Sequence, residues 1–63
     1  GRSAIGAVID EKGVPRDLVI VRPVGMGLDE MAMLAVMQFR LTPATRNGKP
    51  IPFWIEIEYG FGD

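Results

Sequence analysis

The sequence predicts an α+β domain in which one helix packs on a face of a three-stranded antiparallel sheet, in the chain order strand, strand, helix, strand. Three patterns carry this prediction. Apolar residues alternate along residues 51–61, an apolar stripe repeats at helical spacing within residues 28–40, and two β-prone runs flank a turn at residues 10–13. The whole chain, residues 1–63, is expected to form a single domain.

Residues 4–10 form the first expected strand, because apolar side chains share one of its faces at Ile5, Ala7 and Ile9. The turn that follows contains Gly13, which can take the positive φ of a tight hairpin. The hairpin returns into a second strand.

The second strand is expected at residues 14–24, with Pro15 and Pro23 limiting its hydrogen-bonded length. Its centre is apolar on both faces. The pairs are Leu18 and Ile20 on one face, and Val19 and Val21 on the other. Because a strand of a one-layer sheet should be polar on its outer face, something is expected to cover the back of this strand.

Residues 28–40 are predicted to be helical. Asp29 and Glu30 stand in the first turn, where the helix dipole favours acids, and Arg40 stands in the last. Pro43 prevents continuation much further. The apolar stripe consists of Leu28, Ala32, Ala35, Val36 and Phe39.

The opposite face of this helix is also apolar. It carries Met31, Met33, Leu34 and Met37. A helix that is apolar nearly all round is normally buried on more than one side. Two interpretations stay open: the helix lies in the core of an intertwined dimer, or it offers an adaptable, Met-lined groove to a partner.

Residues 51–61 form the longest expected strand, spanning roughly 35 Å at about 3.3 Å per residue. One face carries Ile51, Phe53, Ile55, Ile57, Tyr59 and Phe61, and the other carries Pro52, Trp54, Glu56, Glu58 and Gly60. The hairpin is too short to cover the whole strand, so part of it is expected to pair elsewhere.

Pro50 and Pro52 distinguish the two lateral edges of this strand, since residues i and i+2 direct their backbone groups to the same side and proline has no N–H. The residues expected to pair with the hairpin are Ile51, Phe53, Ile55 and Ile57. Trp54, Glu56 and Glu58 then leave their backbone groups at a free edge. An extended peptide can add there by β-augmentation, and the alternative is that the edge pairs with its copy in a dimer.

Composition limits the function classes. A chain of 63 residues buries only about 60% of its unfolded surface, and it has no cysteine to cross-link it. At 48% hydrophobic residues it is rich for its size, which favours burial in a homodimer. A net charge of −1 with no run of basic residues argues against nucleic-acid binding. No apolar run reaches the roughly 20 residues that a membrane span needs.

The residues for catalysis are missing. There is no His or Cys, and the one serine, Ser3, lies near a terminus that is expected to fray. Glu56 and Glu58 share a strand face, but a solvated face explains them better than a catalytic or metal-binding pair. We therefore predict that the chain is not an enzyme and takes no cofactor or metal.

At this point three stretches resemble a known family, the C-terminal domain of TonB-type energy transducers. They read GAVIDEKGVPRDLVIVRPVG at residues 6–25, GLDEMAMLAVMQFR at residues 27–40, and PATRNGKPIP at residues 43–52. The resemblance covers residues 6–61, and its specific part runs from residue 35 to residue 50.

The resemblance implies a periplasmic domain of an inner-membrane-anchored protein that couples the proton-motive force to outer-membrane transporters. It implies contact with the inner-membrane proton-channel complex through segments outside this chain. In that family a transporter segment, the TonB box, adds as a strand beside the last strand. Carried over, the partner-binding residues are Pro52, Phe53, Trp54, Ile55, Glu56, Ile57, Glu58 and Tyr59.

Two features depart from the family pattern. The family has a Tyr-Pro-containing helical segment before the first strand, and this chain starts after it; family domains shortened in this way also form intertwined dimers. Polar residues are usual in the family where Met31, Leu34 and Met37 stand. A structural self-association module that uses the same strand edge is therefore the alternative function.

Overall fold

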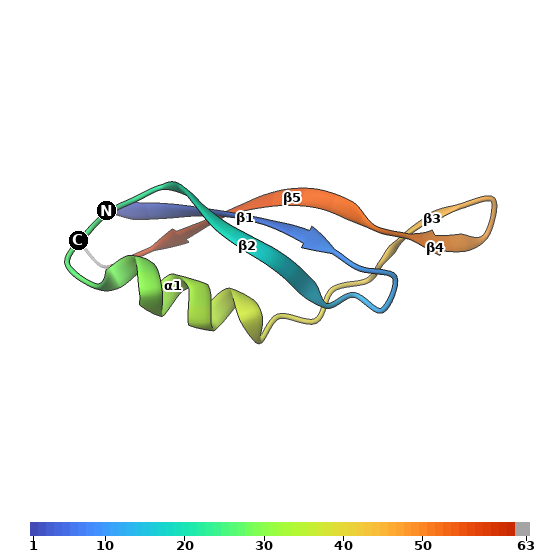
Figure 1. The fold of residues 1–63 in the computed structure, drawn as a ribbon, viewed down its shortest axis with the longest axis horizontal. Helices are drawn as coiled ribbons and strands as arrows, with labels where there is room; N and C mark the ends of the chain where they lie inside the picture. The colour runs from blue at the N-terminus through green and yellow to red at the C-terminus, as the bar shows by residue number, and fades with distance from the viewer. Residues whose placement is uncertain (62–63) are drawn as a thin grey trace.

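The computed structural model describes residues 1–61. Within them the elements are β1 (Arg2–Ile9), β2 (Pro15–Arg22), α1 (Leu28–Met37), β3 (Ala44–Arg46), β4 (Lys49–Ile51) and β5 (Phe53–Gly60). An antiparallel three-stranded sheet has the order β2-β1-β5, and β3 and β4 form a separate hairpin. Helix α1 lies along one face of the sheet (Figure 1). The predicted α+β architecture is confirmed.

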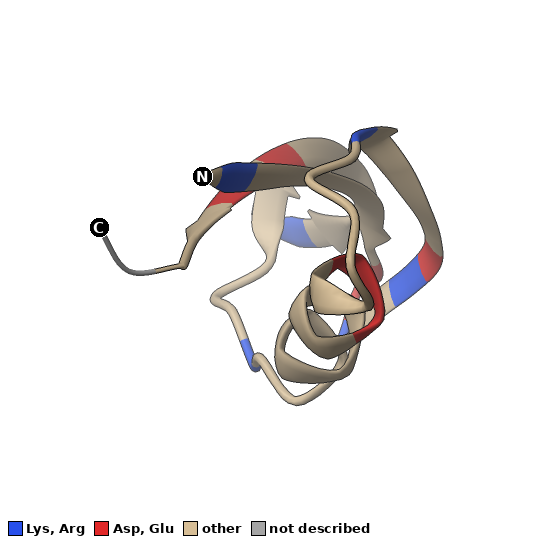
Figure 2. Ribbon diagram, turned by 90° about the vertical axis from the view of Figure 1, so that its left-hand side faces the viewer, with Lys and Arg blue, Asp and Glu red and all other residues tan. Residues whose placement is uncertain are grey.

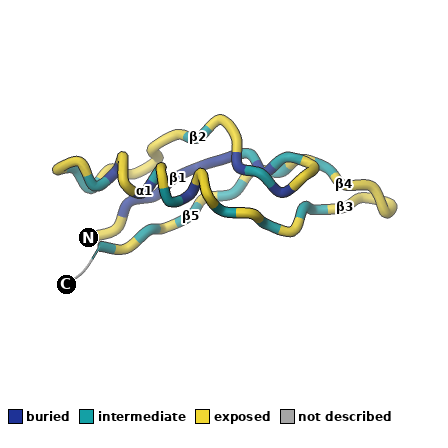
Figure 3. The backbone as a smooth tube through the Cα atoms, turned by 90° about the horizontal axis from the view of Figure 1, so that it is seen from below, coloured by how far each residue is buried: buried dark blue, intermediate teal, exposed yellow. Residues whose placement is uncertain are grey.

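The core lies between the central strand β1 and α1. Ile5 of β1 packs with Ala32 and Val36 of α1, and all three are fully buried. Burial of an aliphatic side chain of this size stabilises a fold by about 1.5–3 kcal/mol. Figure 3 shows the buried stretch running along β1, with the outer strands more exposed. Partly buried side chains complete the core: Leu18, Met33, Phe39, Ile57, Tyr59 and Phe61.

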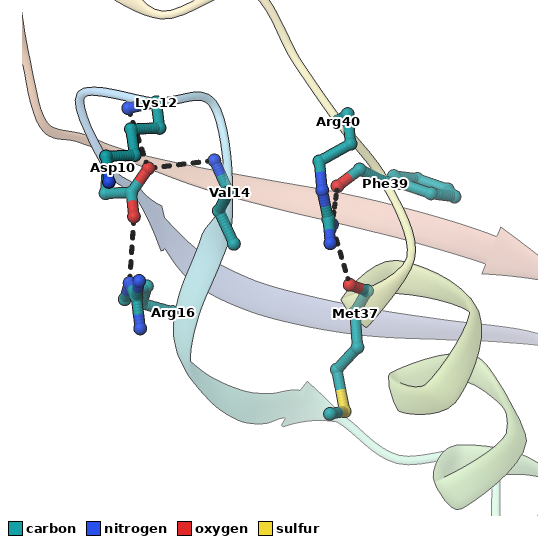
Figure 4. A network of polar contacts seen from close by, with 7 residues as sticks. All are labelled: Asp10, Lys12, Val14, Arg16, Met37, Phe39 and Arg40. Carbon is teal, nitrogen blue, oxygen red and sulfur yellow. Dashed lines mark hydrogen bonds and ion pairs between the residues drawn. The ribbon is translucent and has the colours of Figure 1, made fainter.

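The turn between β1 and β2 is organised by the carboxylate of Asp10. It accepts hydrogen bonds from the N–H groups of Lys12 and Val14, both at 2.9 Å, and from Arg16 Nε at 2.8 Å (Figure 4). The Arg16 guanidinium, with the two N–H groups, lowers the pKa of Asp10 to about 2. Gly13 closes the turn at φ 82°, as its position in the sequence predicted.

The same turn holds the segment that follows the helix. The Leu41 N–H donates to the Gly13 carbonyl at 2.9 Å, and a Cβ at Gly13 would lie 1.8 Å from the Leu41 carbonyl oxygen. Only glycine permits this approach, so the hairpin and the chain leading to β3 are packed against each other.

Helix α1 begins after Gly27, which is left-handed at φ 74°. The predicted end at Arg40 was wrong, since the helix ends at Met37. Gln38 and Phe39 donate to carbonyl groups three positions back, which tightens the last turn. The Arg40 guanidinium binds the Met37 carbonyl at 3.1 Å and the Phe39 carbonyl at 2.7 Å (Figure 4). These bonds satisfy carbonyl groups that a longer helix would have used.

Asp29 joins α1 to the start of β1. Its carboxylate accepts a hydrogen bond from the Ser3 hydroxyl at 2.6 Å, and others from the N–H groups of Val24 at 2.9 Å and Gly25 at 2.8 Å. The Ser3 bond and then the two N–H groups lower the pKa of Asp29. The expectation that the chain frays at Ser3 was wrong, because Ser3 is fully buried within β1.

The expectation of one unbroken strand over residues 51–61 was also wrong. The chain divides at Pro52 into β4, which pairs with β3, and β5, which pairs with β1. Asn47 and Gly48 take φ values of 52° and 78°, a two-residue turn that folds β3 onto β4. Strand β1 pairs with all eight residues of β5, so the first hairpin covers more of the predicted strand than expected. Of residues 51–61 only Ile51 pairs with β3, opposite Ala44, and the expectation that Ile51 pairs with the first hairpin was wrong. The resulting molecule is elongated, 42 × 20 × 17 Å (Figure 1).

Strand β2 is shorter than predicted and irregular. It covers Pro15–Arg22, its register with β1 shifts twice, and Asp17 has a φ of 54°. Val19 and Val21 are 48% and 46% exposed. Among residues 1–61, no second layer covers this side of the sheet, which faces away from α1 (Figure 2).

Candidate functional site

The free edge of β5 is the most distinctive surface of the described chain. Among residues 1–61, the sheet order is β2-β1-β5, so β5 has β1 on one side and no strand on the other. Edge strands carry unpaired N–H and C=O groups, which makes them templates for pairing with another chain. Which residues carry those groups depends on the register with β1.

The end of β5 gives that register. The Phe61 N–H donates to the Gly1 carbonyl at 2.9 Å, and the Gly1 amino group approaches the Phe61 carbonyl at 3.4 Å, so these two residues form a hydrogen-bonded pair. From there the pairing runs without a shift to Ile9 opposite Phe53. Bonded and non-bonded pairs alternate in antiparallel sheets. The odd-numbered residues of β5 therefore bond to β1, and the even-numbered residues direct N–H and C=O to the free edge.

Strand β4 continues the same arrangement. Arg46 and Lys49 flank the two-residue turn and form its bonded pair, which places Pro50 opposite Thr45 in a non-bonded pair. The missing N–H of Pro50 therefore interrupts no bond to β3. Pro50 and Pro52 both lie on the even-numbered side, and the edge gains N–H donors only from Trp54 onward, as the proline spacing predicted.

The two faces of β5 differ as the alternation predicted. The odd-numbered side chains, from Phe53 to Tyr59, are half-buried, and Ile57 and Tyr59 pack against the core. The even-numbered side chains are exposed on the face away from α1. A strand added beside β5 would therefore have an apolar surface on the helix side and a mixed surface on the other.

Trp54 dominates that mixed surface. It is 50% exposed, and its ring extends over Gly6 of β1. A Cβ at Gly6 would lie 2.3 Å from two carbons of the Trp54 ring and 3.1 Å from a methyl group of Val21. Gly6, which has no side chain, thus leaves the space in which the indole ring packs. Trp54 in turn covers part of the apolar back of β2, which was expected to need a cover.

Glu58 is held by arginines from both other strands of the sheet. Its carboxylate pairs with Arg2 of β1 at 3.1 Å and with Arg22 of β2 at 2.9 Å. These two guanidinium groups lower the pKa of Glu58. Exposed ion pairs contribute little to stability individually, but this cluster neutralises the negative charge of Glu58 on the face away from α1.

The residues assigned to the site from the sequence lie along one strand and the break before it. Their contacts with β1 and β2 could not be read from the sequence, and these bring Gly6, Arg2 and Arg22 into the site. Gly6 had a signal of its own, because an isolated glycine inside a strand pattern often marks a close approach of another group. No sequence pattern pointed to Arg2 or Arg22.

Other surfaces offer less chemistry. An open hollow of about 500 Å³ lies between the start of β2 and α1, lined by Val14, Pro15, Arg16, Asp17, Leu18, Met33 and Met37. Its arginine, Arg16, is already bound to Asp10. Within residues 1–61, no cluster of His, Cys, Asp or Glu side chains could hold a metal ion, and no helix is long and apolar enough to cross a membrane.

A model of a known protein family matches nearly the whole chain. The family model described as the Gram-negative bacterial TonB protein C-terminal matches residues 1–62. The chain belongs to this family. The resemblance drawn from the sequence motifs is thereby confirmed, and a TonB C-terminal domain is a transducer domain without catalytic activity. Comparisons with curated proteins and with solved structures find no match.

Proposed function

We propose that this TonB C-terminal domain binds the TonB box of an outer-membrane transporter as an added strand along the free edge of β5. The partner-binding residues are Pro52, Phe53, Trp54, Ile55, Glu56, Ile57, Glu58 and Tyr59. Family membership supports a transducer domain that interacts with outer-membrane receptors. The observation that carries the mode of binding is the register, which leaves the even-numbered backbone groups of β5 unpaired by β1.

The setting of this activity follows from the family. A Gram-negative TonB domain works in the periplasm as part of a membrane-anchored protein. In the proposed function, the strand added to β5 is the mechanical link through which the proton-motive force, delivered by an inner-membrane proton-channel complex, acts on the transporter. Main-chain hydrogen bonds provide affinity in such an arrangement, and the side chains of alternate residues provide specificity.

The test is a titration of the monomeric protein with a TonB-box peptide, followed by amide chemical shifts and hydrogen exchange. We expect the even-numbered amides of Trp54, Glu56 and Glu58 to shift and to gain protection from exchange. The odd-numbered amides, already bonded to β1, should change less. Unchanged shifts from Trp54 to Tyr59 at a saturating peptide concentration would refute the proposal.

Self-association is the second candidate, and the exposed apolar face of α1 favours it. Met31, Leu34 and Met37 are 58%, 59% and 52% exposed. Sedimentation over a wide concentration range distinguishes the two candidates. A tight dimer that no peptide opens would favour a structural module, and a monomer that binds peptide would favour the transducer domain.

A further inference from the structure

Three side chains stand in a row on the free edge of β5, on the face away from α1, and two of them are engaged with the sheet. Trp54 rests over Gly6, and Glu58 is bound by Arg2 and Arg22. Glu56 lies between them. Among residues 1–61, no hydrogen bond or ion pair reaches the Glu56 carboxylate.

The register explains why Glu56 has no partner within the sheet. Its neighbour on β1 is Gly6, which has no side chain to offer. The space over Gly6 is filled by the Trp54 ring and approached by Val21, both apolar. The arginines that could reach this face are those already paired with Glu58. The carboxylate therefore lacks a cation on its β1 side, and a cation can reach it from a strand added on the free side.

A second copy of this chain meets penalties on that free side in two of its registers. In an antiparallel pair of β5 strands centred on Glu56, the carboxylate stands opposite its own copy. Like charges directly opposite one another destabilise a sheet. Centring on Ile55 places Glu58 opposite Pro52, which has no N–H to donate. The registers centred on Glu56 and on Ile55 thus each carry a penalty.

We propose that Glu56 selects the peptide that β5 binds, by favouring an extended segment with Lys or Arg opposite it and an apolar side chain opposite Trp54. This inference rests on the proposed function and adds the chemistry of the partner. The two positions lie two residues apart on the added strand, because side chains on one face of a strand alternate. Charge complementarity of this kind gives specificity and disfavours wrong partners, here acidic segments and a second copy.

The experiment uses three blocked, tryptophan-free peptides of β-prone sequence, identical except for Lys, Gln or Glu at one central position. Binding is followed by the emission of Trp54, the single tryptophan of the chain. We expect the Lys peptide to bind roughly two- to fivefold more tightly than the Gln peptide, and the Glu peptide to bind more weakly by a similar factor. The preference should shrink as salt is added.

Two variants make the test specific. Glu56→Lys should reverse the order of the three peptides, whereas Glu30→Lys, the same change at an exposed site on α1, should leave the order unchanged. Equal affinities for all three peptides, with the amides of β5 still shifted, would overturn the selection by Glu56 and leave the proposed function standing. If none of the three peptides shifts the amides of β5, the selection by Glu56 is overturned, and both proposals fail together if a TonB-box peptide also leaves these amides unchanged.

Discussion

Because the Trp54 ring packs directly over Gly6, the substitution Gly6→Ala should displace the ring. The added methyl group would lie 2.3 Å from two ring carbons, so the indole must move outward by more than about 1 Å to reach an ordinary contact distance of about 3.5 Å. The ring is the movable partner, because Gly6 belongs to the central strand and is buried. The substitution therefore tests a contact at the proposed binding edge without touching β5.

The magnitude follows from the area involved. A buried tryptophan removes up to about 250 Å² from water, and Trp54 is 50% exposed, so its packing buries up to about 125 Å² and stabilises the fold by up to about 3 kcal/mol. Partial displacement loses part of this. Alanine in a strand recovers about 0.5–1 kcal/mol relative to glycine. We expect a net loss of about 0.5–2 kcal/mol in the free energy of unfolding.

Urea unfolding followed by circular dichroism measures this loss, and the native emission of Trp54 should shift to longer wavelength as the ring becomes more exposed. Gly60→Ala is the matched control, since within residues 1–61 no atom outside its chain neighbours lies within 4 Å of a Cβ at Gly60. The control should be neutral or slightly stabilising. In a Trp54→Ala background most of the penalty of Gly6→Ala should disappear, because the ring is gone and only the 3.1 Å approach to Val21 remains.

One outcome would refute the reasoning. If Gly6→Ala stabilises the protein as much as Gly60→Ala does and leaves the emission of Trp54 unchanged, the ring does not rest on Gly6. The lack of a partner for the Glu56 carboxylate among residues 1–61 would then need a different explanation, because the ring would no longer occupy the space over Gly6.

Two further predictions concern the buried and charged carboxylates. Asp29→Asn should lower the urea midpoint clearly more than Glu30→Gln, since Asp29 binds Ser3, Val24 and Gly25 whereas Glu30 is exposed; equal midpoints would contradict this role. Asp10, Asp29 and Glu58 all have a pKa below the ordinary value, and that of Asp10 is about 2. Their stabilisation is therefore complete above about pH 5 and should be lost as the pH falls toward 2, and urea midpoints that stay constant over this range would disprove it.

Much of the fold follows from local patterns. The alternation along β5 requires only that one face is buried and the other is exposed to solvent. It could therefore be recognised in the sequence without knowing the partner strand. The turn at Gly13 and the Asn47-Gly48 turn depend on backbone conformations that these residues adopt most readily. The edge polarity of β5 followed from proline chemistry, because a residue without N–H cannot serve a paired side.

The wrong predictions concerned features that no local sequence pattern determines. The end of α1 depended on Arg40 reaching back to carbonyl groups, which competes with one more helical turn. The division at Pro52 depended on β3, a strand too short to show a pattern of its own. The burial of Ser3 depended on the position of Asp29, which lies far along the chain.

The sequence by itself determined that the last strand has one apolar face, one paired edge and one edge opened by prolines, since each property follows from a single segment. The tertiary structure decided what stands beside that edge. Trp54 over Gly6, the two arginines on Glu58 and the unpaired Glu56 all depend on the register between strands that are distant in the chain. That register is set by packing β1 against α1, because slipping by one residue would turn Ile5 away from the core.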